Sequence, residues 1–277
     1  MSRSGQLDRY LAILGVESEP PSLDHLNRLV QAQITRVPFE NISKLWLKKT
    51  QGATTVPSLE QHLDGIERHH FGGTCYANNP YFAELLRHLG YEVAMCGADM
   101  LNPDVHVVSI VRLDGREYLV DVGYGAPFFE PIARDLDREL EIAFGRNRYV
   151  LHPQDGRGRS RMDHFRDGEL IHGYVAKPEP REIGHFDEII RHSYSSAATF
   201  MNVVVVERFF DTHSVRFHNY TLTESTKDGA FTTELAGRNE LAGRNELAAA
   251  LEGHCGFPRE IVLEVIADIT LEADIYS

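Results

Sequence analysis

The 277-residue sequence predicts an α+β protein in three parts: an N-terminal helical bundle (1–90), a central antiparallel β-barrel (91–200) and a smaller C-terminal α/β unit (201–277). Three observations predict this division. Apolar residues recur at helical spacing up to about residue 90, short β-branched and aromatic runs follow, and the last third combines such runs with a helical segment. A chain of this length has room for two or three domains and a large buried core.

Four helices are expected in the first ninety residues. Ser22 and Ser58 are good N-caps, and Gln61 completes a capping box with Ser58. Gly15 and Gly90 can adopt the left-handed conformation that commonly follows a helix end. The expected segments are 7–15, 23–36, a helix that starts at Ser58, and 80–89.

Strands are expected from Tyr91 onward. Asp114-Gly115 and Asp167-Gly168 each separate two strand-like runs, which is the strongest short-range signal for a β-hairpin. Two more strands are expected in 201–210 and 215–225, and a helix in 245–256 that ends at Gly253 or Gly256.

A tandem LAGRNE-LAGRNE lies at 235–246. Six residues are far fewer than a structural repeat unit, and each copy carries a glycine that weakens a helix. We interpret the duplication as a surface insertion before the last helix and assign it no function.

The composition excludes several classes of protein. The formal net charge of −13 argues against nucleic acid or an anionic membrane as the main partner. No apolar run approaches the roughly 18 residues of a membrane span, and the first residues lack the apolar stretch of a signal peptide. A cytoplasmic protein is therefore expected. Three cysteines are too few and too scattered for a disulfide framework.

Cys75 is the candidate nucleophile. It follows Gly72-Gly73-Thr74, and a helix that started at Cys75 would stabilise a thiolate there. Asn79-Pro80 is an alternative N-cap and first helical residue, so the helix could instead begin at Pro80 or begin at Cys75 and kink. A buried cysteine that acts only as a small apolar residue is the alternative role for Cys75, and it is the role expected for Cys96 and Cys255.

His106 and Asp121 are the candidate base and orienting group. With Asp114-Gly115 at the turn, Leu113 would face Arg116 and His106 would face Gly123, so that Asp121 is the diagonal neighbour of His106 on the same face. A diagonal pair lies within reach of a hydrogen bond, and we expect Gly123 to leave room for the imidazole. The alternative is a polar pair on a solvated face. Against this alternative, Asp121 lies in an apolar run, where an unpaired carboxylate is costly.

Other chemistries have little support. His69, His70 and Cys75 are close in sequence, but they form no CxxC or HxxxH pair, so no metal site is expected. The sequence contains neither of the glycine-rich motifs that bind nucleotide phosphates.

Three blocks occur in order: Arg36-Val37-Pro38-Phe39-Glu40-Asn41-Ile42, then Gly72-Gly73-Thr74-Cys75-Tyr76, then His106 followed fifteen residues later by Asp121-Val122-Gly123-Tyr124-Gly125. This order resembles the arylamine N-acetyltransferase family, and the likeness extends more weakly through the TLTES segment and the C-terminal helix. The resemblance implies a helical bundle, a β-barrel and an α/β lid, with a papain-like Cys-His-Asp triad.

The resemblance also implies a reaction. Cys75 would take an acetyl group from acetyl-CoA, His106 would transfer protons and Asp121 would orient the imidazole, in a ping-pong transfer to an arylamine, an arylhydrazine or a related small-molecule amine. Phe39 and Tyr124 occupy positions that line the acceptor site in the family, although ordinary core aromatics remain an alternative. Gly125 lies where the coenzyme approaches the backbone.

The chain departs from the family at two positions near Cys75. Phe71 replaces an arginine and Ala77 replaces a glutamate. Without that arginine, Glu40 needs a different partner or faces water. The segment between Cys75 and His106 is also shorter than usual.

Two other functions remain open. The first is an amide synthase of natural-product assembly, which would take its acyl chain from a carrier protein and form a macrolactam. The second is a catalytically silent binding protein. If coenzyme A binds, local groups must meet its phosphates against an acidic background, so salt-sensitive affinity is expected.

Overall fold

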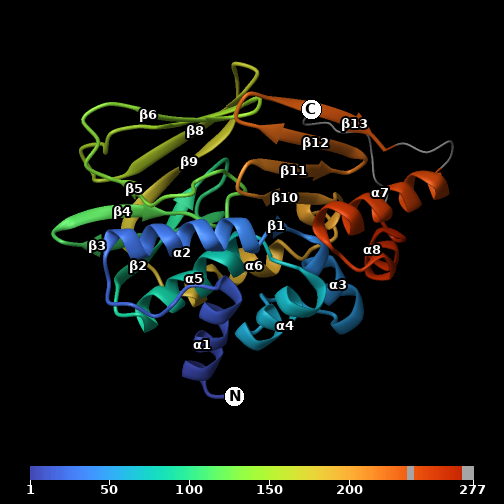
Figure 1. Cartoon of the computed structure of the whole chain (residues 1–277), viewed down its shortest axis with the longest axis horizontal. Coiled ribbons are helices and arrows are strands. Elements are labelled where there is room, and N and C mark those ends of the chain that lie inside the picture. Colours follow the sequence, from blue (N-terminus) through green and yellow to red (C-terminus); the bar gives the residue numbers. More distant parts are fainter. Residues whose placement is uncertain (236–239, 270–277) are drawn as a thin grey trace.

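The computed structural model describes residues 1–235 and 240–269 and has the expected α+β fold (Figure 1). The first five helices lie on one side of the molecule and two antiparallel sheets lie on the other. The helices are α1 (Arg3–Leu14), α2 (Leu23–Arg36), α3 (Ile42–Gln51), α4 (Leu59–His69), α5 (Cys75–His88), α6 (Asp187–His192), α7 (Glu240–Cys255) and α8 (Arg259–Ile266), with short 3-10 turns at Ile183–Phe186 and Thr199–Met201.

The helix ends follow the local signals. The Ser22 hydroxyl accepts a hydrogen bond from the backbone N–H of His25, and Ser58 and Gln61 form the expected capping box. Gly15 ends α1 with φ 61°. Helix α3 was not expected, although Asn41 precedes it and Gly52 ends it in the left-handed conformation with φ 64°.

The eight-stranded sheet has the order β5-β4-β3-β2-β9-β8-β7-β6. This order is linear and ends at β5 and β6, so the expected barrel is an open, curled sheet, and α5 packs against β2 and β3. Its strands are β2 (Glu92–Asp99), β3 (His106–Leu113), β4 (Arg116–Val120), β5 (Ile132–Ala133), β6 (Leu140–Phe144), β7 (Asn147–Leu151), β8 (Ser160–Arg166) and β9 (Glu169–Pro180).

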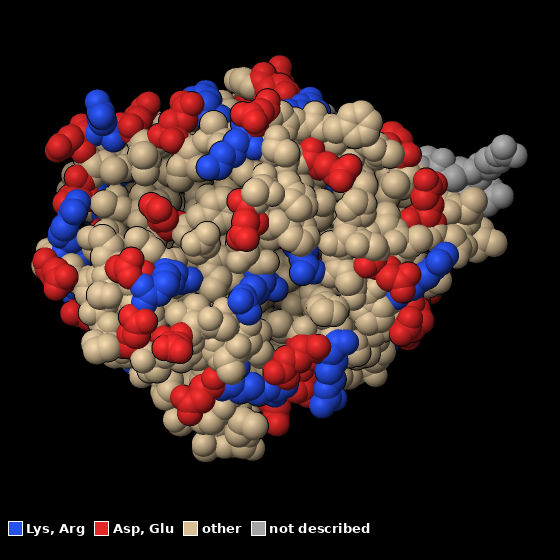
Figure 2. Space-filling model, in the orientation of Figure 1, with Lys and Arg blue, Asp and Glu red and all other residues tan. Residues whose placement is uncertain are grey.

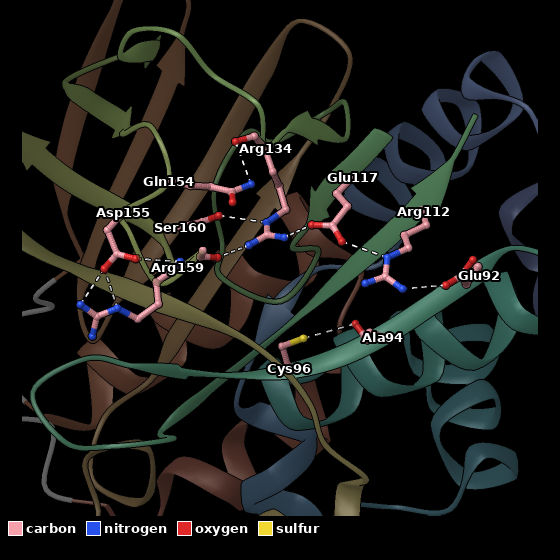
Figure 3. A network of polar contacts seen from close by, with 11 residues as sticks. Glu92, Ala94, Cys96, Arg112, Glu117, Arg134, Gln154, Asp155, Arg159 and Ser160 are labelled. Carbon is pink, nitrogen blue, oxygen red and sulfur yellow. Dashed lines mark hydrogen bonds and ion pairs between the residues drawn. The ribbon is translucent and has the colours of Figure 1, made fainter. Parts of the chain in front are cut away.

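A buried arginine helps to hold the curl of this sheet. Arg134 forms an ion pair with Glu117 of β4, and its Nε donates a hydrogen bond to the hydroxyl of Ser160 on β8 at 3.1 Å (Figure 3). Glu117 also binds Arg112 of β3, which pairs with Glu92 of β2. Because β4 and β8 are not neighbours in the strand order, these contacts connect strands that no backbone ladder joins.

The five-stranded sheet has the order β1-β10-β11-β12-β13. Its first strand comes from the N-terminal part of the chain, where Phe39 pairs with Glu207. The strands are β1 (Phe39–Glu40), β10 (Val205–Phe209), β11 (His213–His218), β12 (Thr221–Thr226) and β13 (Gly229–Glu234).

Two sequence-based expectations in this region were wrong. Residues 215–225 form a hairpin instead of one strand, because Asn219 adopts a left-handed conformation (φ 51°) at the turn between β11 and β12. The second LAGRNE copy (241–246) is not an insertion before the helix but the first part of α7, where Leu241 and Ala242 are exposed and Gly243 is already buried. Most of the first copy lies outside the described residues.

Charge is mixed over the surface. Figure 2 shows acidic and basic side chains interleaved on one face of the molecule instead of gathered into a basic patch. Within residues 1–235 and 240–269, no helix is long and apolar enough to cross a membrane.

Candidate active site

Cys75 is the first residue of α5, and the helix continues through Pro80. This settles the alternative between a start at Cys75 and a start at Pro80. The backbone N–H groups of Ala77 and Asn78 both bond to the carbonyl of Thr74. The side chain of Cys75 is buried, and Cys75 lies at the positive end of the helix dipole.

The two glycines before Cys75 allow a close approach between distant segments. A Cβ on Gly72 would lie 1.9 Å from the carbonyl oxygen of Pro38, so no larger residue fits there without a shift of the backbone. Gly73 donates a hydrogen bond to the same oxygen and accepts one from the N–H of Glu40. The first two blocks of the sequence are therefore adjacent in space.

His106 and Asp121 form a buried pair. The hairpin has the expected register, with Leu113 opposite Arg116, and Nε2 of His106 lies 2.8 Å from Oδ2 of Asp121. The two residues are 3% and 4% exposed, which excludes a polar pair on a solvated face. Since Nε2 contacts Asp121, the other ring nitrogen, Nδ1, is available to the sulfur of Cys75.

The carboxylate of Asp121 raises the pKa of the His106 imidazole. Burial lowers the pKa of His106, but the carboxylate of Asp121 and a hydrogen bond to Cys75 outweigh burial and raise the pKa to about 10. The imidazolium form is therefore favoured at neutral pH, beside a sulfur that would balance its charge.

Asn79 is a site residue that the sequence analysis missed. Its amide nitrogen donates to Oδ1 of Asp121 at 2.9 Å and to the carbonyl of Val107 at 2.7 Å, and its oxygen accepts from the N–H of Val122. Asn79 lies one helical turn after Cys75, so both side chains face the hairpin. The spacing of four residues was visible, but the following proline made Asn79 look like a helix cap.

Gly123 has a different role from the one expected. A Cβ at this position would lie 2.6 Å from Nδ2 of Asn79 and 2.8 Å from the Cα of Cys75. The space next to Gly123 therefore holds the start of α5, not the imidazole of His106.

Of the predicted substrate residues, Tyr124 contacts His106, whereas Phe39 forms a β-bridge with Gly73 in the loop before Cys75. The ring of Tyr124 meets that of His106 edge to face, with the centroids 5.7 Å apart, and burial raises the pKa of Tyr124. Phe39 contacts the ring of Phe200, and a Cβ on Gly125 would lie 3.3 Å from the Phe39 ring. Tyr174, which was not predicted, packs against both rings, with its ring centre 5.1 Å from that of His106 and 5.5 Å from that of Tyr124.

Of the two alternatives for Glu40, a different partner or exposure to water, the structure shows the first. Glu40 is fully buried, and its carboxylate accepts hydrogen bonds from the backbone N–H groups of Ser43 and Gly72. Burial raises the pKa of Glu40. Phe71 instead packs its ring against Trp46 and belongs to the apolar core of the C-terminal sheet.

A buried lysine lies next to the loop that precedes Cys75. The ammonium group of Lys44 donates to the hydroxyl of Ser193 at 2.7 Å and lies 4.3 Å from the ring centre of Tyr194. Burial lowers the pKa of Lys44 to about 8, and the charge of Cys75 opposes this shift. Lys44 shares a small cavity with Thr74 and Tyr76 at the start of α5.

The other two cysteines have the environment of core residues. Burial raises the pKa of Cys96 to about 11 and that of Cys255 to about 12. Among the residues that the model describes, no group of three His, Cys, Asp or Glu side chains is arranged to hold a metal ion.

Comparison with known proteins identifies a family and several relatives whose sequences resemble this chain. Residues 22–248 match a family model described as N-acetyltransferase. Arylamine N-acetyltransferase 2 of Mus musculus is 30% identical over 138 residues, which cover 46% of each chain. Proansamycin X synthase of Amycolatopsis mediterranei is 25% identical over 184 residues, which cover 62% of this chain and 68% of the synthase.

A solved structure shares the fold over nearly the full length. The arylamine N-acetyltransferase of Mycobacterium marinum, determined in complex with CoA, superimposes with a TM-score of 0.77 at 20% identity and covers 96% of this chain and 100% of its own. The match to the mouse enzyme spans about half the length of that relative.

Proposed function

The chain belongs to the arylamine N-acetyltransferase family, and we propose that it transfers an acetyl group from acetyl-CoA to an arylamine, an arylhydrazine or a related amine through a thioester on Cys75. The observation that carries this proposal is the position of Cys75, at the start of α5 and beside the buried His106–Asp121 pair, where it helps to raise the pKa of His106.

In the first half of the reaction, the thiolate of Cys75 attacks the carbonyl carbon of the donor thioester. The bond between that carbon and the coenzyme sulfur breaks, and the imidazolium of His106 gives its proton to the leaving thiolate. The products are acyl-Cys75, free coenzyme and a neutral imidazole.

In the second half, the amine nitrogen attacks the acyl carbon of the Cys75 thioester. His106 takes a proton from that nitrogen, the carbon–sulfur bond breaks, and the amide leaves. This restores the thiolate and the imidazolium, so the two halves form a closed cycle without net oxidation.

Two neighbouring groups support these steps. Asp121 holds the orientation of the imidazole and balances its charge, and Asn79 holds Asp121. The N–H groups of Ala77 and Asn78 are bonded to the carbonyl of Thr74, so we assign the N–H groups of Cys75 and Tyr76, which precede them in α5, to the oxyanion that forms at the acyl carbon.

The same arrangement suggests where the substrates bind. We assign Phe39 and Tyr124 to the acceptor site, because their rings lie near His106 and Gly125. We assign Gly125, with φ 78° and no side chain, to the approach of the coenzyme. Because the chain is acidic, we expect the KM for acetyl-CoA to rise with ionic strength.

The test is incubation with acetyl-CoA followed by intact-mass measurement. An acetyl adduct that is absent in Cys75→Ala and that an added arylamine removes would support the proposal. If no short acyl-CoA forms an adduct, the proposal is wrong. If iodoacetamide nevertheless alkylates Cys75 rapidly at neutral pH, the site is intact and the donor is of another kind; an inert thiol would indicate a silent family member.

An amide synthase is the second candidate. It is supported by the match to proansamycin X synthase, which extends over 184 residues and covers 68% of that protein. A thioester carrying an arylamine at the far end of its acyl chain separates the two functions, because an amide synthase releases a cyclic amide from it. An acetyltransferase would acetylate the free arylamine and leave the thioester open.

A further inference from the structure

The loop that leads into His106 is bonded to the helix that begins at Cys75. This loop covers residues 100–105 and joins β2 to β3. The hydroxyl of Tyr76, the residue after Cys75, donates a hydrogen bond to the backbone carbonyl of Asp104 at 2.6 Å. One contact therefore connects the neighbour of the candidate nucleophile with a residue two positions before the histidine.

The surroundings of Tyr76 favour this bond. Burial raises the pKa of Tyr76, and the charges of Cys75 and Asp104 act in the same direction, so the hydroxyl keeps its proton at neutral pH and donates it. The ring is 6% exposed and packs against that of Phe186, with the ring centres 5.8 Å apart. Because little water reaches the hydroxyl, the hydrogen bond is stronger than it would be on the surface.

Lys177 of β9 binds the same loop through carboxylates. Its ammonium group lies 2.6 Å from Oδ1 of Asp104 and 2.7 Å from Oδ1 of Asp99, the residue before the loop. Burial lowers the pKa of Lys177, but the contacts with Asp104 and Asp99 outweigh burial and raise the pKa. Nε2 of His185 lies 3.4 Å from the other carboxylate oxygen of Asp104. The charge of Lys177 thus connects the start of the loop with its end.

The pairing of β2 with β9 is irregular at this point. It shifts between Cys96 and Ala98, so that residues 177–179 of β9 lie opposite the single residue Gly97. Such a bulge re-aims side chains and is common next to active sites. A Cβ on Gly97 would lie 2.0 Å from Oδ1 of Asp104, so the absence of a side chain there leaves room for the carboxylate.

The backbone ladders support His106 mainly from one neighbouring strand. His106 is the first residue of β3 and pairs with Ala98 of β2, whereas the ladder between β3 and β4 ends at the pair Ser109–Val120. The position of the imidazole relative to Cys75 therefore depends on the loop that precedes it. A misplacement of about 1 Å can lower a reaction rate about 100-fold, so this dependence matters for the reaction.

We propose that Tyr76 and Lys177 are positioning residues, which hold His106 against Cys75 by fixing the loop 100–105. They act through this loop and transfer no proton to or from the substrate. The proposal rests on the proposed function, because the placement of His106 affects a reaction only if His106 and Cys75 act together.

The first measurement is the rate of Cys75 acylation by acetyl-CoA in the full-length protein. Tyr76→Phe keeps the ring and the backbone N–H but removes the hydroxyl, and Lys177→Met removes the charge. We expect each to lower the maximal rate about tenfold and to leave the half-saturating concentration of acetyl-CoA within about twofold. Lys177→Arg, which can still bind both carboxylates, should stay within about threefold of the wild-type rate.

The second measurement does not depend on acyl transfer. Iodoacetamide alkylation of Cys75 is followed by peptide mass, which separates Cys75 from the other two cysteines. The ratio of the rate at about pH 6 to the rate at about pH 8.5 is compared between proteins. It should fall at least about fivefold in Tyr76→Phe and in Lys177→Met, because the imidazolium would then lie farther from the sulfur.

Two matched variants control for a general loss of stability. Tyr81 is also a buried tyrosine of α5, but its hydroxyl donates to the carbonyl of Pro57. Lys49 of α3 forms an ion pair with Asp268 at 2.8 Å. Tyr81→Phe and Lys49→Met should be less stable in urea, yet keep the acylation rate and the alkylation ratio within about twofold of wild type.

Several results would overturn the proposal. If folded Tyr76→Phe and Lys177→Met alkylate with the wild-type ratio, the loop does not position His106. An equal fall in Tyr81→Phe would mean that the effect is one of general stability. If Tyr76→Phe fails to fold, the comparison of Lys177→Met with Lys177→Arg decides. A ratio that falls in both variants of a protein that forms no acetyl adduct would support the positioning and contradict the proposed acyl donor.

Discussion

Replacement of Asn79 by alanine tests the proposed link between the start of α5 and the His106–Asp121 pair. The substitution removes three buried hydrogen bonds: to the carbonyl of Val107 at 2.7 Å, to Asp121 at 2.9 Å and from the N–H of Val122 at 2.9 Å. A buried group that loses its partner costs about 1–3 kcal/mol. With three partners affected, the free energy of unfolding should fall by about 3 kcal/mol or more.

The effect on the reaction is separable from the effect on stability. Asp121 keeps its contacts with His106 and with the N–H of Gly123 but loses one hydrogen bond to a charged oxygen. Such a bond contributes about 1.5–3 kcal/mol, which corresponds to a reduction of about 10- to 100-fold in the rate of Cys75 acylation.

The assay is the rate of adduct formation with acetyl-CoA, followed by intact mass across pH, together with urea unfolding. Asn78→Ala is the matched control, because Asn78 is also buried on α5 but donates only to the carbonyls of Pro38 and Gly73. We expect both variants to lose stability and only Asn79→Ala to shift the pH profile. An acylation rate within about threefold of wild type in a folded Asn79→Ala protein would refute the reasoning.

Three further predictions follow from single groups. Gly123→Ala places a methyl group 2.8 Å from the Cα of Cys75, so the free energy of unfolding should fall by about 1–3 kcal/mol. Gly253→Ala is the control, because its Cβ would meet open space on a helix and alanine should stabilise the protein there. Urea unfolding measures both variants, and equal effects would contradict the prediction. The raised pKa of His106 keeps an imidazolium beside Cys75, so iodoacetamide should still alkylate Cys75 rapidly at about pH 6. An ordinary thiol has a pKa of about 8.5. An alkylation rate that increases steadily with pH up to about 8.5 would contradict this prediction. Burial lowers the pKa of Lys44 to about 8, below its value in the unfolded chain. The unfolded chain therefore binds the extra proton between about pH 8 and 10.5, so the free energy of unfolding should rise with pH there, and this rise should be smaller in Lys44→Met.

Much of the fold could be predicted because its signals are local. The caps at Ser22 and Ser58 and the left-handed glycine after α1 each depend on a few neighbouring residues. Helix α3, which Asn41 precedes and the left-handed Gly52 follows, and the turn at Asn219 carry signals of the same kind, but neither was predicted.

The candidate site also contains one part that local signals predict and one part that they do not. The Asp114-Gly115 turn sets the register of its hairpin, and the register brings His106 next to Asp121. The role of Asn79 could not be predicted in this way, because its partners lie 28 to 43 residues away in sequence.

The sequence by itself determined which residues could react: a cysteine after two glycines, and a histidine and an aspartate paired across one hairpin. Only the tertiary structure decided that Asn79 supports Asp121, that Gly123 makes room for α5, and that Lys44 and His62 are buried. The physical reason is the distance along the sequence over which each interaction acts. Caps and turns act over three or four residues, whereas burial and the close approach of backbones depend on segments that meet only after the whole chain has folded.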